Sequence, residues 1–337
     1  VSMSAIKVEV LNREFLRQIP GANNLMESID YVNGVQKQIN CGVCGTNDIH
    51  LNGMEGPYTL VLIDGMPIIS ALGTVYGLNG IPSSMIERIE IVKGPASTLY
   101  GSEAVAGIVN VITRDPKSAP KLFFEGYGTS HGESNLDFAA RPQIGKLQGL
   151  FSGNYYRMQN RLDSNNDNFT DIPLSQRLSL FNKWTVLRKN NRKATFAAKY
   201  YHENRFGGQL QWTNGDVGSD SVYGEYIATR RIEALGSYQL PFSKETVRLD
   251  VSGSAHWQDS HYGNTPYLAQ QHTGFSNLVW LKSIDRHNML FGSSVRYTYY
   301  DDNTAATPYG ADVNVLAGLF VQDEWRPTSK LSLLGGA

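Results

Sequence analysis

The sequence predicts a mainly β fold, in which a transmembrane antiparallel β-barrel follows a smaller N-terminal α+β domain. Three observations support this fold class. The composition combines 18 % charged residues with 33 glycines and 18 tyrosines, a balance typical of barrels with many turns and aromatic belts. Long segments in the second part of the chain alternate apolar and polar residues. The connections between these segments alternate between short and long.

The first part of the chain is predicted to hold short helices. Asn12 can cap a helix over residues 13–18, because its side chain can accept a hydrogen bond from a free amide of the first turn. A second helix is expected to start at Asn23 or Asn24 and to end before Gly34.

The pattern changes near residue 115. We interpret residues 1–115 as a compact mixed domain and residues 116–120 as a linker with two prolines in its short length. Residues 121–337 are interpreted as the N-terminal part of the barrel, with about eleven strands.

One predicted strand spans residues 247–257. Apolar side chains alternate there with polar ones, so one face is apolar and the other polar. In a transmembrane barrel the apolar face contacts lipid and the polar face lines the lumen. The apolar positions are Val247, Leu249, Val251, Ala255 and Trp257.

The connections favour a membrane barrel over a soluble sandwich, because turns at one end and loops at the other are expected to alternate strictly. Short turns are expected near residues 142–145, 189–192, 241–244, 285–287 and 327–329, and long loops at residues 160–173, 206–224, 260–271 and 301–314.

Three segments carry a resemblance to a known family. Residues 60–67 read LVLIDGMP, residues 86–95 read IERIEIVKGP, and residues 99–113 read LYGSEAVAGIVNVIT. Leu60–Ile63 is an apolar run ended by Asp64-Gly65, which predicts a buried strand and a tight turn. In this order the three segments resemble the plug domain of TonB-dependent outer-membrane receptors.

The resemblance implies a plug in the lumen of a barrel in a Gram-negative outer membrane, in contact with outer-membrane lipid. It implies active uptake of a scarce metal chelate (haem, a siderophore or cobalamin) driven by a TonB-type periplasmic energy-coupling protein. A surface lipoprotein that delivers the ligand is a further candidate partner. Plugged outer-membrane transporters have 22 strands, so about half a barrel is expected here.

We expect the sequence to continue beyond both of its ends. It starts at Val1 without a charged leader, so a signal peptide is expected to have been removed. It stops at Ala337 in an apparent strand, and an open half-barrel cannot sit in lipid with unpaired edges.

Cys41 and Cys44 form a Cys-x-x-Cys pair in a loop that the resemblance places next to the substrate. In an oxidising envelope a disulfide is the expected state. The alternative is a copper-binding receptor in which both thiolates, with Met54, hold a soft metal. Asn47 and Tyr76 are further expected ligand contacts in plug loops.

An acidic loop is a candidate calcium site. Oxygen-bearing side chains stand at Asp163, Asn165, Asp167 and Asp171, which are positions 1, 3, 5 and 9 of an EF-hand loop. Position 12 is Leu174, so the bidentate carboxylate is missing and affinity should be weak. The alternative is a solvated Asn/Asp loop.

Aromatic and histidine residues gather in the expected outer loops. Trp212, His261 and Tyr262 are predicted to contact the ligand by stacking or polar bonds. Trp257 could equally belong to an aromatic girdle at the membrane interface.

Several function classes have no support. No nucleophile elbow, phosphate loop or zinc-protease motif occurs, so the chain is not expected to be an enzyme or to hold an organic cofactor. Net charge is −1 and no basic patch suggests a nucleic-acid partner. A passive porin is the alternative from another class, and the plug signature disfavours it.

Overall fold

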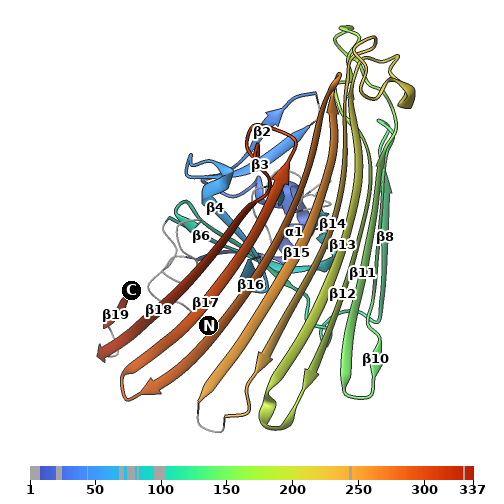
Figure 1. Cartoon of the computed structure of the whole chain (residues 1–337). Coiled ribbons are helices and arrows are strands. Elements are labelled where there is room, and N and C mark those ends of the chain that lie inside the picture. The colour runs from blue at the N-terminus through green and yellow to red at the C-terminus, as the bar shows by residue number, and fades with distance from the viewer. Residues whose placement is uncertain are drawn as a thin grey trace.

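The computed structural model describes residues 8–19, 25–43, 45–67, 72–73, 80–81, 83–94, 104–242, 245–328 and 331–337. Two parts are seen in Figure 1: a small N-terminal domain, in blue, and a curved sheet of long tilted strands that passes in front of it. No helix in the described part of the chain is long and apolar enough to cross a membrane.

The described residues of the N-terminal domain, called the plug below, form a five-stranded sheet, the short helices α1 and α2, and a separate hairpin. The sheet order is β1-β6-β7-β4-β5, and β4 and β7 are parallel. Its elements are β1 (Val8–Asn12), α1 (Arg13–Gln18), α2 (Leu25–Ile29), β2 (Val35–Cys41), β3 (Thr46–Leu51), β4 (Thr59–Ile63), β5 (Met66–Pro67), β6 (Ile86–Lys93) and β7 (Gly107–Thr113).

The local predictions for the plug are largely confirmed. The side chain of Asn12 caps α1 by accepting a hydrogen bond from the Phe15 amide at 2.9 Å. All five residues of β4 are buried, and the chain turns at Asp64 and Gly65 with φ of 51° and 81°. The second helix ends at Ile29, earlier than expected. Asn23 and Asn24 lie outside the described residues.

The second sheet, called the wall below, is antiparallel. Eleven strands lie on one continuous path from β8 to β19, and β10 pairs only with β11. The predicted number of about eleven strands is confirmed. Its strands are β8 (Leu122–Gly128), β9 (Glu133–Ala140), β10 (Gln143–Ile144), β11 (Leu147–Met158), β12 (Leu174–Leu187), β13 (Lys193–Gly208), β14 (Gly224–Gln239), β15 (Thr246–Tyr262), β16 (Thr265–Ile284), β17 (His287–Asp302), β18 (Asp312–Thr328) and β19 (Leu331–Gly336).

Burial along the wall is inverted relative to a soluble protein. On β15 the polar residues at even positions from Asp250 to Ser260 are buried, whereas Val251 is 42 % exposed. On β14 Arg231 and Glu233 are buried and Ile232 is 48 % exposed. The predicted polar lumen face and apolar outer face are both confirmed, because lipid takes the place of water outside.

One predicted loop is wrong. Residues 260–271 do not form a long loop: β15 and β16 continue through this segment and join at a tight turn of Gly263 and Asn264. Gly263 has φ of 58°. Long connections do occur at residues 159–173, 209–223 and 303–311. Short and long connections therefore do not alternate strictly.

Between β7 and β8 lies the segment in which the linker 116–120 was predicted. No strand interrupts residues 114–121, all of which are described. The domain bounds at residues 115 and 121 stay predictions.

Candidate functional site

The plug contacts the inner face of the wall at two levels. The upper level lies toward the long loops, where the β2–β3 hairpin points (Figure 1). Its turn, the described residues of which are 41–43, 45 and 46, is called the apex below. The lower level joins the plug sheet to the middle and lower wall.

At the upper level the apex contacts the last residues of β13 and the first residues of β14. The Sγ of Cys41 lies 3.0 Å from Oε2 of Glu225. Arg205 Nη1 donates to the carbonyl oxygen of Gly45 at 2.7 Å. These contacts join positions more than 150 residues apart and fix the apex against polar groups of the wall.

The backbone of the apex approaches the wall very closely at Gly207. A Cβ atom added there would lie 1.7 Å from the carbonyl oxygen of Val43. Only glycine allows this approach without displacing backbone. Gly45, with φ of 63°, faces Pro173 in the same way at 2.7 Å. The sequence therefore specifies where the apex sits.

Charged and hydroxyl groups hold the wall residues beneath the apex. Glu203 accepts hydrogen bonds from Tyr201, Arg205 and Ser175 at 2.6, 2.8 and 2.8 Å. Each lumen-facing charge here has a partner, as burial requires.

Tyr223 supports the carboxylate that faces Cys41. It lies in the connection before β14 and donates to Oε1 of Glu225 at 2.8 Å. Burial and this hydrogen bond raise the pKa of Tyr223 to about 12. Its phenol therefore stays protonated and remains a hydrogen-bond donor to Glu225.

Deeper in the lumen, five wall side chains form a connected polar network, called the polar ladder below: Lys199, Glu233, Arg231, His256 and Gln258. Lys199 and Arg231 both bind the Glu233 carboxylate, and Arg231 contacts His256 at 3.3 Å. Gln258 continues the ladder. Arg231 and Glu233 are 1 % and 2 % exposed, so these charges depend on one another for solvation.

The lower level combines one ion pair with an apolar patch. Lys183 Nζ lies 2.9 Å from Oδ2 of Asp64 and 2.6 Å from Oγ1 of Thr113. Ser252 donates to the carbonyl of Pro67 at 2.8 Å. Four wall side chains also pack into the plug core: Leu150, Phe181, Ala197 and Leu235.

The comparisons with known proteins agree with this architecture. Residues 1–108 match the family described as TonB-dependent Receptor Plug Domain. Residues 1–108 therefore belong to the plug-domain family, and the chain as a whole is similar to part of a TonB-dependent receptor.

Named relatives of this receptor family are transport proteins. The ferric enterobactin receptor PirA of Pseudomonas aeruginosa is 34 % identical over 184 residues, which cover 50 % of this chain and 24 % of that protein. The vitamin B12 transporter BtuB of Vibrio vulnificus is 37 % identical over 98 residues, or 29 % of this chain and 16 % of that protein.

Solved receptor structures share the fold along nearly the whole chain. The siderophore receptor PirA from Pseudomonas aeruginosa aligns with a TM-score of 0.65 and 19 % identity, over 98 % of this chain and 57 % of that one. The ferric yersiniabactin receptor FyuA from Yersinia pestis gives 0.70 and 18 %, over 99 % and 56 %. The chain spans less than two thirds of the length of these relatives.

The disulfide prediction is met in part by the receptor structure. Cys41 is disulfide-bonded, and the described residues hold no free cysteine. Cys44, like Tyr76, lies outside the described residues, so the predicted pairing stays a prediction. Met54 packs against the plug core.

Trp212 packs against the wall, and its predicted contact with the ligand stays a prediction. It is 3 % exposed and stacks on Phe206, with ring centroids 4.0 Å apart and an interplanar angle of 17°. Tyr226 lies against it as well, at 6.2 Å. Phe206 and Tyr226 belong to the outward face of the wall, so the ring holds the 209–223 loop against the outside of the barrel.

The other predicted ligand contacts that the structure describes lie on three different strand segments. His261 lies at the upper end of β15 on the outward face, 3.7 Å from Asp259. Tyr262 pairs in register with Glu225, beside the apex contact. Asn47 lies on β3, opposite Ile39. Ligand contacts by these residues stay predictions.

The acidic loop binds its own backbone. Asp163 accepts from the amides of Asp167 and Asn168 at 3.1 and 3.0 Å, and Asp171 accepts from Ser164 at 2.6 Å. Among the described residues, no three His, Cys, Asp or Glu side chains gather as they would around a metal ion. Calcium binding through Asp163, Asn165, Asp167 and Asp171 stays a prediction.

Sequence reasoning missed Arg205, Gly207 and Glu225 as apex contacts. The Gly207-Gly208 pair at the end of a strand was the available signal, since paired glycines often mark close backbone approach.

Proposed function

We propose that this chain is the plug and adjoining wall of a receptor that imports a metal chelate across the outer membrane of a Gram-negative bacterium. The substrate class is a siderophore, haem or cobalamin complex, and a TonB-type periplasmic protein supplies the energy. The observation that carries this proposal is a plug docked in the lumen at two levels of different chemistry.

The two levels suggest how transport proceeds. The apex contacts are polar, and water can replace each hydrogen bond at a net cost of about 1 kcal/mol. The lower level includes an apolar patch and the Lys183–Asp64 pair, whose separation exposes apolar surface. Ligand bound over the apex can therefore shift it at low cost, whereas opening the lower level requires work supplied from the periplasm.

The alternatives fit less well. A passive porin needs an open lumen, but here Arg231, Glu233 and other lumen side chains are buried. A copper receptor needs free thiolates, and Cys41 is disulfide-bonded. A delivering surface lipoprotein is part of the proposal only through the family resemblance.

Binding and uptake by the full-length receptor test the proposal. Ferric enterobactin, haemin and cyanocobalamin are each titrated against tryptophan fluorescence, and uptake of the labelled chelate is measured in cells with and without TonB. We expect one chelate to bind and to accumulate only with TonB. Accumulation without TonB, or binding of none of the three, would contradict the proposal.

Two glycine substitutions at different positions of the wall test the role of the apex. Gly207→Ala places a methyl group against the Val43 carbonyl and should displace the apex, weakening chelate binding about tenfold, equivalent to the loss of one hydrogen bond to a charged group. Gly253→Ala meets only ordinary contact, with Thr273 oxygen at 3.4 Å, and should bind as the parent does. Equal affinity of both variants for the chelate would show that the apex is not part of the binding site.

A further inference from the structure

Tyrosines in or next to the lumen face of the wall donate their phenolic protons to carboxylates. Four such pairs are described, with oxygen–oxygen distances of 2.6 to 2.9 Å: Tyr156–Glu133, Tyr201–Glu203, Tyr223–Glu225 and Tyr300–Asp302. In three of them the carboxylate follows the tyrosine by two positions, which is the spacing of one strand face. Because a phenol has a single proton to donate, the proton of each of these tyrosines is committed.

The last of these pairs includes a second phenol. Tyr267 Oη lies 3.0 Å from Tyr300 Oη. Since Tyr300 gives its proton to Oδ2 of Asp302 at 2.6 Å, the proton between the two phenols comes from Tyr267. The donors therefore run in one direction, from Tyr267 through Tyr300 to Asp302. Tyr267 and Tyr300 are called the tyrosine pair below.

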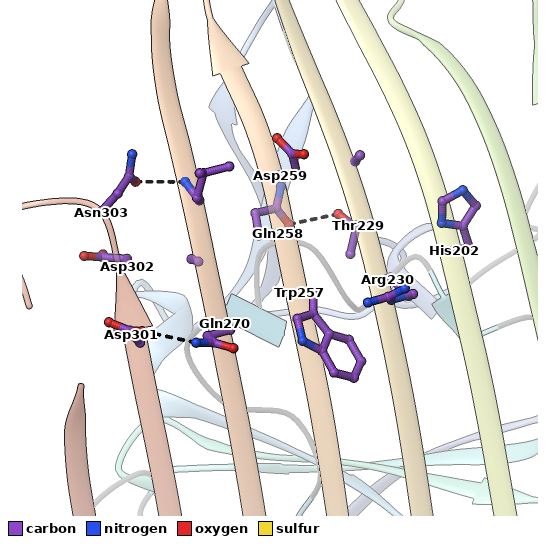
Figure 2. Close-up of a pocket in the computed structure, with 13 residues that line it drawn as sticks. His202, Thr229, Arg230, Trp257, Gln258, Asp259, Gln270, Asp301, Asp302 and Asn303 are labelled. Carbon is purple, nitrogen blue, oxygen red and sulfur yellow. Dashed lines mark hydrogen bonds between the residues drawn. The ribbon is translucent and has the colours of Figure 1, made fainter. Parts of the chain in front are cut away.

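Asp302 is held as an acceptor by the connection that follows it. It is the last residue of β17 (Figure 2). Its carboxylate accepts hydrogen bonds from the Thr304 amide and from the Thr304 and Thr307 hydroxyls, at 2.9 Å each. Several donors around one carboxylate favour its ionised form, so Asp302 has no proton to return to Tyr300.

The two faces of the wall are clearly separated at this level. Asp301 accepts a hydrogen bond from Gln270 on the outward side, near Trp257 (Figure 2). The outward position of Trp257 agrees with the girdle interpretation of this residue. Tyr300, one position before Asp301, pairs in register with Gln271, which is only 3 % exposed. The tyrosine pair therefore faces the lumen.

The tyrosine pair lies close to the apex contact. Tyr267 pairs in register with Ser260 on β15. Two positions further along β15, Tyr262 pairs with Glu225, which faces Cys41 of the apex. Two strand spacings, or about 10 Å, separate β16 from β14. A chelate bound over the apex can therefore contact Glu225 and the tyrosine pair together.

The tyrosine pair offers a ligand lone pairs and no proton, because each phenolic oxygen can still accept a hydrogen bond. Gln271 adds an acceptor beside the pair: among the described residues its Oε1 has no hydrogen-bond partner, although the side chain is buried. Lumen-facing arginines on nearby strands bind carboxylates, Arg205 that of Glu203 and Arg231 that of Glu233. This part of the wall thus favours a ligand that donates hydrogen bonds.

We propose that this lumen face selects a chelate whose rim carries N–H groups, and disfavours one whose rim carries carboxylates or phenolates. An N–H group would meet a phenolic lone pair, whereas an anionic oxygen would meet lone pairs and the negative charges of Asp302 and Glu225. The inference rests on the proposed function, because it places the chelate over the apex. Of the classes named there, cobalamin fits best, since primary amides surround its corrin ring. Haem carries carboxylates, and a catecholate siderophore complex carries phenolate oxygens.

Matched ligands test the inference on the unmodified full-length receptor. Cyanocobalamin is compared with its monocarboxylate derivatives, in each of which one rim amide has been hydrolysed to a carboxylate. Dissociation constants are measured by tryptophan fluorescence, and ferric enterobactin is titrated alongside. We expect at least one monocarboxylate to bind about tenfold more weakly than cyanocobalamin, because repulsion replaces a net hydrogen bond.

Two conservative variants separate the loss of an acceptor from the release of a proton. Tyr300→Phe frees the Tyr267 proton to donate to a ligand carboxylate, so the preference for cyanocobalamin should shrink to less than about twofold. Tyr267→Phe removes an acceptor and frees no proton, so cyanocobalamin should bind about fivefold more weakly and the preference should remain. The control is Tyr299→Phe, the same change on the outward face, where Tyr299 pairs with His272. It should bind both ligands as the unmodified receptor does.

The outcomes separate this inference from the proposed function. Equal binding of the amide and carboxylate forms by the unmodified receptor would overturn the inference, and so would an unchanged preference in Tyr300→Phe. Tight binding of ferric enterobactin in place of cyanocobalamin would also overturn it, while the proposed function would stand. If no chelate binds, the proposed function fails and the inference fails with it.

Discussion

The plug and the wall bury opposite kinds of side chain. In the plug, Ile29, Leu51 and Ile89 are fully buried. In the wall, Arg231 and Glu233 are buried while Ile232 between them is 48 % exposed. The two parts belong to one chain and contact each other, yet they follow opposite rules.

The difference teaches that the surroundings, and not the residue type, decide which face is buried. The plug is enclosed by a polar lumen, so it hides its apolar residues as any water-soluble domain does. The wall has lipid outside and the plug inside, so its apolar residues face out. Where the two parts meet, the described hydrogen bonds and charged groups hold the upper level, and an apolar cluster that joins plug and wall lies at the lower one.

The largest expected effect comes from the buried polar ladder. Glu233→Ala leaves Lys199 and Arg231 without their shared carboxylate, and should lower the free energy of unfolding by about 3–5 kcal/mol. The next residue along the strand is the control: Ile232→Ala removes lipid-facing methylenes without leaving a cavity and should cost about 1–2 kcal/mol. Denaturant unfolding of the receptor in lipid measures both. A larger loss for Ile232→Ala would mean that the wall follows the rule of a soluble protein.

The second prediction places a charge on the lipid face. Val251→Arg puts a guanidinium on the outward face of β15, between the levels of Trp280 and Trp257. It should lower the free energy of unfolding by about 2–4 kcal/mol if this position lies near the bilayer midplane. Val251→Leu keeps the position apolar and should change stability by less than about 1 kcal/mol. The measurement is the same unfolding experiment in lipid vesicles. Indifference to the arginine would place Val251 outside the hydrocarbon region.

The sequence was sufficient for the pattern of the wall and insufficient at its upper end. Alternation from Val247 to Trp257 follows directly from a lipid face and a polar lumen. Beyond Trp257, toward the long loops, both faces of a strand meet water, so the alternation of apolar and polar residues disappears. Residues 260–271 therefore have the composition of a loop although they form two strands.

The candidate site was predictable only on the plug side. Cys41 stands out as half of a local motif, and the resemblance places it near the substrate. Its wall contact Glu225 is 184 residues away, and no local pattern marks a residue by a partner that distant. The stacking of Trp212 could not be predicted for the same reason, because only the folded sheet shows that Phe206 and Tyr226 face outward and contact it.

The third prediction concerns the lower contact between the two parts. Lys183→Met removes the cation that joins Asp64 and Thr113, but Asp64 keeps hydrogen bonds from the Thr113 amide and hydroxyl. The plug should therefore be held less tightly by about 1–2 kcal/mol, seen as faster hydrogen exchange of β4 and β7 amides. Lys193→Met, at an exposed strand end, should leave exchange unchanged. Identical exchange in both variants would show that the ion pair contributes nothing to plug retention.

The smallest effect is expected in the 159–173 loop, which belongs to neither the plug core nor the membrane band. Asp163 accepts two backbone amides there, from Asp167 and Asn168. Asp163→Ala should loosen the loop by about 1–2 kcal/mol, the value of capping bonds of this kind, and speed hydrogen exchange at those two amides. Asp312→Ala, at the exposed start of β18, is the control.

The same measurement decides the calcium prediction, because an ion held by the carboxylates would slow exchange in the parent and not in the variant. With Leu174 in place of the twelfth-position glutamate, affinity should be roughly 10⁻⁴ to 10⁻³ M, so protection should appear only at millimolar calcium. Exchange that ignores millimolar calcium in the parent would leave the loop held by its own amides alone. The carboxylates of the loop would then be satisfied by hydrogen bonds from backbone amides, as the charges of the polar ladder are satisfied by one another.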